Sequence, residues 1–225
     1  MTEIPSRKLA IRKAILNGKS DEVLIIAGKG HESTQEYIKE KKFSDREYIK
    51  KSIIIKNRFS SKDWKLNILK ELIKNKKLEN LKNLRISTNS KGQNKNKIFF
   101  GIKGKRLDGN KFADEALKNG AKLAILQNTS NSGKKIINVK STLELLNKLS
   151  QKIRVSSFAT QVAITGSSGK TSLKELLGQS LQKSYPTIFS KNSFNNKFGL
   201  PISLTNLNKY TSYGIFEIGM DRKGE

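Results

Sequence analysis

Residues 161–181 read QVAITGSSGKTSLKELLGQSL, and this stretch decides the fold. Phe158, Val162 and Ile164 form an apolar run that predicts a strand. The leucines that follow recur at helical spacing and predict a helix: Leu173, Leu176, Leu177 and Leu181. A strand, a glycine-rich loop and a helix, in this order, are the layout of a loop that binds the phosphates of a nucleotide.

Each part of the loop has a chemical task in such a site. Gly166 and Gly169 let the backbone turn tightly, which allows successive N–H groups and the helix amino terminus to point at phosphate oxygens. Lys170 adds a mobile positive charge, and the Thr171 hydroxyl reaches Mg2+. The loop is the short form, because Ile164 stands where the general pattern has its first glycine; an ordinary Gly/Ser turn is the alternative. We therefore expect ATP and Mg2+ as cofactors, bound by Thr165, Gly166, Ser167, Ser168, Gly169, Lys170, Thr171 and Ser172.

A single acidic residue interrupts an apolar strand further along the chain. Residues 213–220 read YGIFEIGM, with Glu217 among apolar neighbours. A carboxylate buried in a strand is costly unless a cation meets it. Mg2+ bound to the nucleotide phosphates would do so, at the end of a strand that neighbours the loop strand. We predict that Thr171 and Glu217 hold the metal; a solvated residue at a sheet edge is the alternative.

Three segments carry a family resemblance: TGSSGKTSLKE from residue 165, NSFNNKFGLPISL from residue 192 and YGIFEIGMDRKGE from residue 213. In this order they resemble the first half of the central ATPase domain of the Mur ligase family, in its D-Ala-D-Ala-adding (MurF) branch. Upstream, ISTNSK from residue 86, IFFGIKGKRLDGNKF from residue 98 and ADEALKNGA from residue 113 resemble the N-terminal domain that holds the UDP end of the substrate. Asn89, Lys91 and Asn110 depart from the aspartate, arginine and histidine that are common there.

The resemblance implies an ATP-dependent amide ligase of peptidoglycan precursor synthesis. Such an enzyme phosphorylates the terminal carboxylate of UDP-MurNAc-tripeptide, and the amine of D-Ala-D-Ala attacks the acyl phosphate. It implies that Lys170 binds the β- and γ-phosphates, and that Asn195 and Asn196 lie between nucleotide and substrate, the three forming the catalytic set. It also implies a site for the UDP-sugar at Ser87, Thr88, Lys103, Asp108 and Gly109.

The first part of the chain resembles a different branch. Ser6 to Leu16 is predicted to be helical with Gly18 as its stop, and Val23 to Ala27 is predicted to be a strand. The turn GKGHE follows from residue 28 and resembles the last segment of the MurE branch, which adds the third stem-peptide residue. By that resemblance Gly28 and Glu32 contact a diamino acid; an ordinary glycine-rich turn is the alternative. SDRE from residue 44 is a capping box that opens a final helix.

The expected organisation is therefore a junction of two ligases. We expect an α/β protein: a MurE-like C-terminal tail (1–55), a linker (56–62), a MurF-like UDP-substrate domain (63–157) and the truncated start of a parallel-sheet ATPase domain (158–225). Two helices are expected in the substrate domain, one with Ile68, Leu69 and Leu72 on its apolar face and one with Leu143, Leu146, Leu149 and Ile153. We expect a fragment of a fused protein whose ATPase part folds poorly, because a parallel sheet needs several βα units to bury its strands. By the resemblance it also lacks the family's downstream catalytic lysine and C-terminal domain, and we therefore expect it to be inactive as a ligase by itself.

The composition of the chain bears on its partners and its location. The chain carries 45 Lys and Arg against 19 Asp and Glu, a net charge of +26, spread over nearly every predicted element and without a ladder of stacking aromatics. We read this as a solvated surface and expect no nucleic-acid partner. Cysteine is absent, and no apolar run approaches the ~20 residues of a membrane span. We expect a cytoplasmic monomer that takes UDP-MurNAc-tripeptide and D-Ala-D-Ala as substrates.

Other function classes stay open at this point. A related amide ligase such as a folylpolyglutamate synthase, or a generic P-loop ATPase, would carry the same phosphate loop. A basic nucleic-acid-binding module would explain the charge, and its binding would depend steeply on salt.

Overall fold

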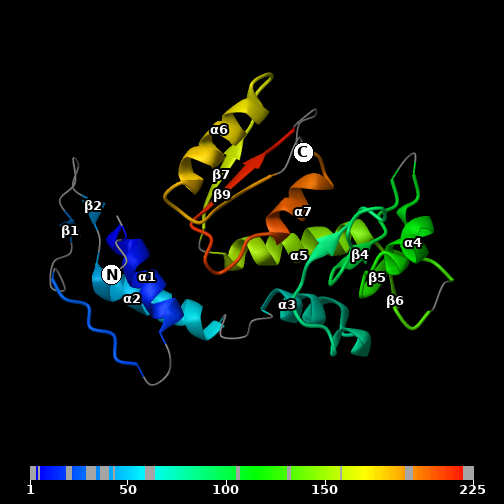
Figure 1. Cartoon of the computed structure of the whole chain (residues 1–225), viewed down its shortest axis with the longest axis horizontal. Helices are drawn as coiled ribbons and strands as arrows, with labels where there is room; N and C mark the ends of the chain where they lie inside the picture. The colour runs from blue at the N-terminus through cyan, green and yellow to red at the C-terminus, as the bar shows by residue number, and fades with distance from the viewer. Residues whose placement is uncertain are drawn as a thin grey trace. The chain divides into compact units, whose positions relative to one another are not determined.

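The computed structural model describes residues 4, 6–18, 22–28, 34–35, 41–42, 44–58, 64–104, 107–130, 133–157, 159–190 and 195–219. The chain divides into two compact units, Met1–Trp64 and Lys65–Glu225. The second unit holds two parallel sheets, one of four strands and one of three, together with the helices that connect their strands (Figure 1). The predicted α/β class is confirmed by this architecture.

In the first unit, helix α1 (Arg7–Asn17) packs against helix α2 (Asp45–Arg58). Their shared core is apolar and consists of Ile11, Ile15, Ile26, Tyr48 and Ile49. Two short strands, β1 (Thr34–Gln35) and β2 (Lys41–Lys42), pair antiparallel. Both predicted helix signals are confirmed: the N–H of Gly18 donates to Ala14 O at the end of α1, and Ser44 Oγ accepts the N–H of Glu47 at 3.4 Å.

The prediction of a strand from Val23 to Ala27 is wrong. This segment has no strand assignment, and Val23 and Ile25 are 90% and 82% exposed. A strand needs a neighbouring strand for its backbone N–H and C=O groups, and none of the described residues pairs with this segment. Its end is held instead by Arg7, which donates to Ala27 O at 3.0 Å and forms an ion pair with Asp45.

The first sheet of the second unit has the order β3-β4-β5-β6, with all pairs parallel. Its strands are β3 (Ile86–Ser87), β4 (Ile98–Phe100), β5 (Leu123–Gln127) and β6 (Ile136–Val139). The central strands β4 and β5 are almost continuously buried, as expected when helices cover a parallel sheet. The core on the α4 side contains Phe99, Ala113, Ala116, Ala121, Ala124, Leu126 and Ile136.

Helix α3 (Trp64–Ile73) and the 3-10 helix η1 (Lys76–Leu78) precede β3, the 3-10 helix η2 (Gly109–Phe112) and helix α4 (Ala113–Lys118) connect β4 to β5, and helix α5 (Thr142–Ser156) follows β6. The predicted apolar face of α5 is confirmed, because Leu146, Leu149 and Ile153 are fully buried. In α3 the buried face differs from the predicted one. Leu66 and Leu69 are fully buried there, whereas Ile68 and Leu72 are only half-buried.

The second sheet follows α5 directly and has the order β7-β9-β8, again all parallel. It consists of β7 (Thr160–Ile164), β8 (Thr187–Phe189) and β9 (Tyr213–Glu217), connected by α6 (Lys170–Gln182) and α7 (Gly199–Thr205). Figure 1 shows α6 and α7 on opposite sides of β7 and β9. The central position of β9 matters for the site, because the last residue of this strand is Glu217.

Helix α6 is present as predicted, but its buried face is a different one. Leu173 and Leu176 are 53% and 67% exposed, whereas Lys174 and Gly178 are buried. The physical reason is close packing on β8: a Cβ added at Gly178 would lie 2.6 Å from the ring of Phe189. Only glycine lets the helix approach the strand this closely, and the rotation that puts Gly178 on the sheet turns the two leucines outward.

Lys65 makes the free energy of unfolding depend on pH. It lies on α3, and its Nζ donates to Thr205 O at the end of α7 at 2.8 Å. Burial, together with the charge of Arg85, lowers the pKa of Lys65 from 10.5 to about 8. Between these values the unfolded chain binds more protons than the folded chain, and the free energy of unfolding therefore rises with pH across that window, by at most on the order of 3 kcal/mol.

We expect Lys65→Met to lose this contribution. The difference in free energy of unfolding between wild type and variant should grow in favour of the wild type as the pH is raised from about 8 to 10.5. Urea unfolding of both proteins across this range measures the difference, and the other lysines cancel because both proteins carry them. Parallel pH profiles would contradict the assignment.

Candidate functional site

The phosphate loop has the backbone that its glycines predict. Residues 165–169 connect the end of β7 to the start of α6. Gly166 has φ +150° and Gly169 has φ +73°, conformations that side-chain-bearing residues rarely adopt. Gly169 is the N-cap residue of α6 and has no side chain to accept the first helical N–H groups. These N–H groups and the helix dipole therefore favour an anion in front of the loop.

The lysine and the threonine of the loop, Lys170 and Thr171, are the first two residues of α6. Lys170 Nζ folds back and donates to the carbonyl oxygens of Gly166 and Ser167, the latter at 3.2 Å. Thr171 Oγ1 points to the sheet and donates to Glu217 Oε2 at 2.9 Å. Thr165, Ser167, Ser168 and Ser172 are exposed around them.

Glu217 is a buried carboxylate, 1% exposed, at the carboxyl end of the central strand. It stands next to Ile164, the last residue of β7, and this position excludes the solvated edge residue considered above. Both carboxylate oxygens are held: Oε2 accepts from Thr171, and Oε1 accepts from Asn195 Nδ2 at 2.8 Å.

The electrostatic balance keeps Glu217 ionised. Burial raises the pKa of this carboxyl, but the hydrogen bonds from Thr171 and Asn195 and the charge of Lys174 outweigh burial and hold the pKa below its ordinary value. Lys174 Nζ lies 3.6 Å from Glu217 Oε2. An ionised carboxylate beside a hydroxyl, next to an anion-binding loop, is a donor set suited to a hard divalent cation.

The two neighbouring asparagines have different surroundings. Asn195 reaches Glu217 with its side chain, and its backbone oxygen accepts the N–H of Gly219 at 2.8 Å. Asn196 Oδ1 accepts the N–H groups of Phe198 and Gly199 at 3.0 and 2.9 Å, at the start of α7. Asn195 therefore belongs, with Thr171 and Lys174, to the carboxylate cluster around Glu217, whereas Asn196 holds the turn that leads into α7.

The residues predicted to hold the UDP-sugar gather at the carboxyl edge of the first sheet. Ser87 ends β3, exposed Thr88 follows it, and Lys103 comes three residues after β4. Lys103 pairs with Asp108 in an antiparallel bridge. The carboxyl ends of parallel strands are where open α/β sheets bind ligands.

Asp108, Gly109 and Asn110 have structural partners at this edge. The N–H of Asn110 donates to Asp108 Oδ1 at 3.0 Å and starts η2. A Cβ at Gly109 would lie 2.6 Å from backbone atoms of Ile102, which only glycine allows. The Asn110 side chain exchanges two hydrogen bonds with the backbone of Gln127 at the end of β5, at 2.9 and 3.0 Å.

Of the two residues predicted to contact a diamino acid, only Gly28 is described. It is exposed, with φ +96°, and a Cβ there would lie 3.6 Å from the Arg7 guanidinium. Glu32 lies outside the described residues.

Sequence reasoning missed Lys174, which is fully buried beside Glu217. A signal was present, because Lys174 follows Lys170 by four residues and Thr171 by three, and residues at these spacings share one face of a helix. A lysine on the same helix face as Lys170 and Thr171 could therefore have been predicted to belong to the site.

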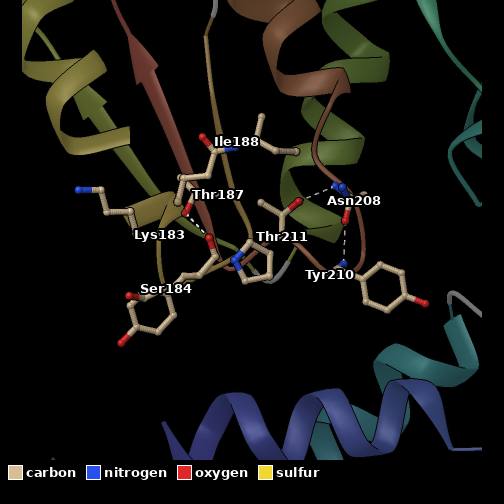
Figure 2. Close-up of a pocket in the computed structure, with 10 residues that line it drawn as sticks. Lys183, Ser184, Thr187, Ile188, Asn208, Tyr210 and Thr211 are labelled. Carbon is tan, nitrogen blue, oxygen red and sulfur yellow. Dashed lines mark hydrogen bonds between the residues drawn. The ribbon is translucent and has the colours of Figure 1, made fainter. Parts of the chain in front are cut away.

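A pocket of about 500 Å3 lies elsewhere in the second unit (Figure 2). It is lined by Gln182, Lys183, Ser184, Tyr185, Pro186, Thr187, Ile188, Asn208, Tyr210 and Thr211. These residues surround the starts of β8 and β9, at the opposite edge of the parallel sheet from the phosphate loop. Polar groups of the lining bond one another: Thr187 Oγ1 donates to Tyr185 O, and the N–H of Asn208 donates to Thr211 Oγ1. The pocket is therefore not part of the nucleotide site.

Comparisons with known proteins agree with this geometry. Residues 85–167 match the model of the Mur ligase family, catalytic domain, and residues 164–225 match the Mur ligase middle domain. A UDP-N-acetylmuramoyl-tripeptide--D-alanyl-D-alanine ligase from Rickettsia prowazekii is 39% identical over 142 residues, which are 62% of this chain and 31% of that protein. The chain thus spans about a third of the length of the curated relatives it matches.

Two solved structures extend the similarity to the fold. The MurF ligase of Thermotoga maritima in complex with ADP has a TM-score of 0.53 and 35% identity, over 62% of this chain and 33% of that one. A MurF crystal structure from Acinetobacter baumannii has a TM-score of 0.61 and 28% identity, over 71% of this chain and 36% of that one. Among the described residues, no helix is long and apolar enough to cross a membrane.

Proposed function

We propose, from the Mur ligase family domains that residues 85–225 carry, that this chain is part of an ATP-dependent ligase that joins D-alanyl-D-alanine to UDP-MurNAc-tripeptide. The observation that carries the proposal is the pairing of Thr171, in the phosphate loop, with the buried carboxylate of Glu217 at 2.9 Å. Relatives named for this reaction, and one of their structures with ADP, support the choice of reaction.

The reaction has two balanced steps. A carboxylate oxygen of the tripeptide attacks the γ-phosphorus of ATP, and ADP leaves. The amine of D-Ala-D-Ala then attacks the acyl carbon, the amide bond forms, the nitrogen loses a proton and inorganic phosphate leaves. Phosphoryl transfer needs charge stabilisation and positioning more than covalent help from the protein.

The residues of this chain would supply that stabilisation. The N–H groups from Gly166 to Lys170 would hold phosphate oxygens, and the Lys170 ammonium would turn from the loop carbonyls to the β- and γ-phosphates. Asn195 would keep the Glu217 carboxylate oriented, as it does by its 2.8 Å hydrogen bond. Asn196 would support this segment by accepting the N–H groups of Phe198 and Gly199 at the start of α7.

Mg2+ fits the donor set. The described residues contain no group of three or more His, Cys, Asp or Glu side chains that could hold a metal, but Mg2+ is usually bound by one or two carboxylates together with substrate phosphates and water. Thr171 and Glu217 would hold it, and when bound it would neutralise charge on the transferred phosphoryl group.

Further assignments follow the family resemblance. We assign the UDP-sugar to the edge formed by Ser87, Thr88, Lys103, Asp108 and Gly109, in a substrate domain of residues 63–157 that precedes the ATPase domain of residues 158–225. Residues 1–55 are assigned to a MurE-like tail, with Gly28 and Glu32 near a diamino acid, and residues 56–62 to a linker. We also propose a cytoplasmic monomer without a nucleic-acid partner.

The test is ligation by a chimera, because the chain spans about a third of its relatives. Residues 85–225 would replace the matching segment of the Rickettsia prowazekii ligase. With ATP, Mg2+, UDP-MurNAc-tripeptide and D-Ala-D-Ala we expect UDP-MurNAc-pentapeptide, ADP and phosphate in equal amounts; the chain of 225 residues alone should give none of these products. A folded chimera that hydrolyses ATP without making pentapeptide would refute the substrate assignment, and one that binds no nucleotide would refute the whole proposal.

A further inference from the structure

Lys174 is the most unusual residue of helix α6. Its side chain is fully buried, while Leu173 and Leu176 on the same helix are 53% and 67% exposed. Lysine is almost never fully buried unless it is paired, and a cation near the amino end of a helix also opposes the helix dipole. The buried charge of Lys174 therefore needs groups of opposite charge that compensate it.

The compensation comes from two carboxylates. Lys174 Nζ lies 3.2 Å from Glu175 Oε1, on a side chain that is 36% exposed, and 3.6 Å from Oε2 of buried Glu217. The longer distance is that of an ion pair without a direct hydrogen bond. Lys174 thus contributes charge to Glu217, while hydrogen bonds from Thr171 and Asn195 fix the orientation of the carboxylate.

Stability alone does not account for this arrangement. A buried ion pair is often replaced by apolar residues of similar size without loss of stability, because removing two charges from water is costly. The lysine and glutamate are therefore better explained by what they do at the loop. Glu217 has a role there as the proposed cation ligand, and Lys174 supplies positive charge to the same carboxylate.

We propose that Lys174 acts as the counter-charge of the Thr171–Glu217 cation site and makes Mg2+ binding dependent on the nucleotide. This inference rests on the proposed nucleotide site. The ammonium satisfies the Glu217 charge when no nucleotide is bound, and it repels a free divalent cation from the Thr171–Glu217 pair. The phosphates of a nucleotide offset this repulsion with their own negative charge, and Mg2+ therefore enters with the nucleotide. Lys174 is a positioning residue that touches neither substrate nor reacting atoms.

The test replaces Lys174 by the apolar residue that matches it in length, Lys174→Met, in the chain of 225 residues without any nucleotide. Thermal unfolding of the wild type should be insensitive to Mg2+ or Mn2+. The variant should unfold at a temperature lower by roughly 5 °C or more without metal, because a buried carboxylate has lost its cation. Divalent cations should restore this loss, and calorimetric titration should show divalent affinity at least about tenfold higher than in the wild type.

Three controls separate this effect from a general change of charge or packing. Lys183→Met removes an exposed charge at the other end of α6 and should give the wild-type response. Lys174→Arg keeps the charge and should also stay insensitive to metal. The double variant Lys174→Met with Glu217→Gln should be insensitive again, because the carboxylate that binds the cation is gone.

Each outcome decides the proposal. A Lys174→Met protein that is unfolded without metal and folds when Mg2+ is added supports it. A protein that stays unfolded at every Mg2+ concentration, or that folds and gains no divalent affinity over Lys183→Met, overturns it. Failure of the nucleotide assignment would be recognised separately, because wild-type protein would then bind no ATP, with or without Mg2+.

Discussion

Lys170→Ala should abolish catalysis in the chimera and leave the fold nearly unchanged. Lys170 is half-buried, and its ammonium contacts only loop carbonyl oxygens among the partners described for it. We expect turnover to fall by at least about a thousandfold, because the lost charge stabilises the phosphoryl group as it is transferred. The unfolding temperature should change by less than about 3 °C, as for a substitution outside the core.

Phosphate release and thermal unfolding, measured on the same preparation, separate the two effects. Lys183→Ala is the matched control, because it removes a charge from the exposed far end of the same helix. Lys170→Arg should recover little, because a guanidinium does not replace a compact ammonium against phosphates at this position. Retained turnover in Lys170→Ala would mean that the loop is a structural turn.

Glu217→Gln should affect both stability and metal dependence. Glutamine has nearly the same shape as glutamate but carries no charge. Buried Lys174 therefore loses the carboxylate that lies 3.6 Å from its Nζ. Breaking a buried pair by removing one partner costs about 3 kcal/mol or more, which corresponds to an unfolding temperature lower by roughly 6–12 °C in a protein of this size. ATP turnover in the chimera should fall by about two to three orders of magnitude, with a requirement for higher Mg2+ concentration.

Glu175→Gln is the matched control for this variant. Glu175 contacts the same lysine at 3.2 Å, but its side chain is 36% exposed, whereas Glu217 is buried. A partly exposed pair contributes less than about 1 kcal/mol, and both stability and Mg2+ dependence should stay close to wild type. If the two variants behaved alike, Glu217 would be one of two equivalent partners of Lys174 and not a metal ligand.

The local elements of the nucleotide site could be read from the sequence. The strand, the loop glycines and the helix follow from hydrophobic spacing and from conformations that only glycine adopts readily, and these are properties of neighbouring residues. The burial of Glu217 could be anticipated for the same reason, because its strand is apolar on both sides. The structure adds that β9 is the central strand and that Thr171 reaches across to it.

The errors arose where a partner distant in the sequence decides the outcome. Val23 to Ala27 has the composition of a strand, but strand formation depends on pairing, and no described segment pairs with it. In α6 the leucines predict the buried face, but the close approach of Gly178 to Phe189 rotates the helix and buries Lys174 instead.

The sequence by itself therefore determined the α/β class, the phosphate loop and the acidic residue that completes it, because backbone conformation and hydrophobic period act over a few residues. Only the tertiary structure decided which helix face meets the sheet and that Asn195 and Lys174 join Glu217. The contacts with Glu217 join residues separated by 22 to 46 along the chain. Packing brings such distant groups together, and the cost of burying a charge then selects which of them must pair.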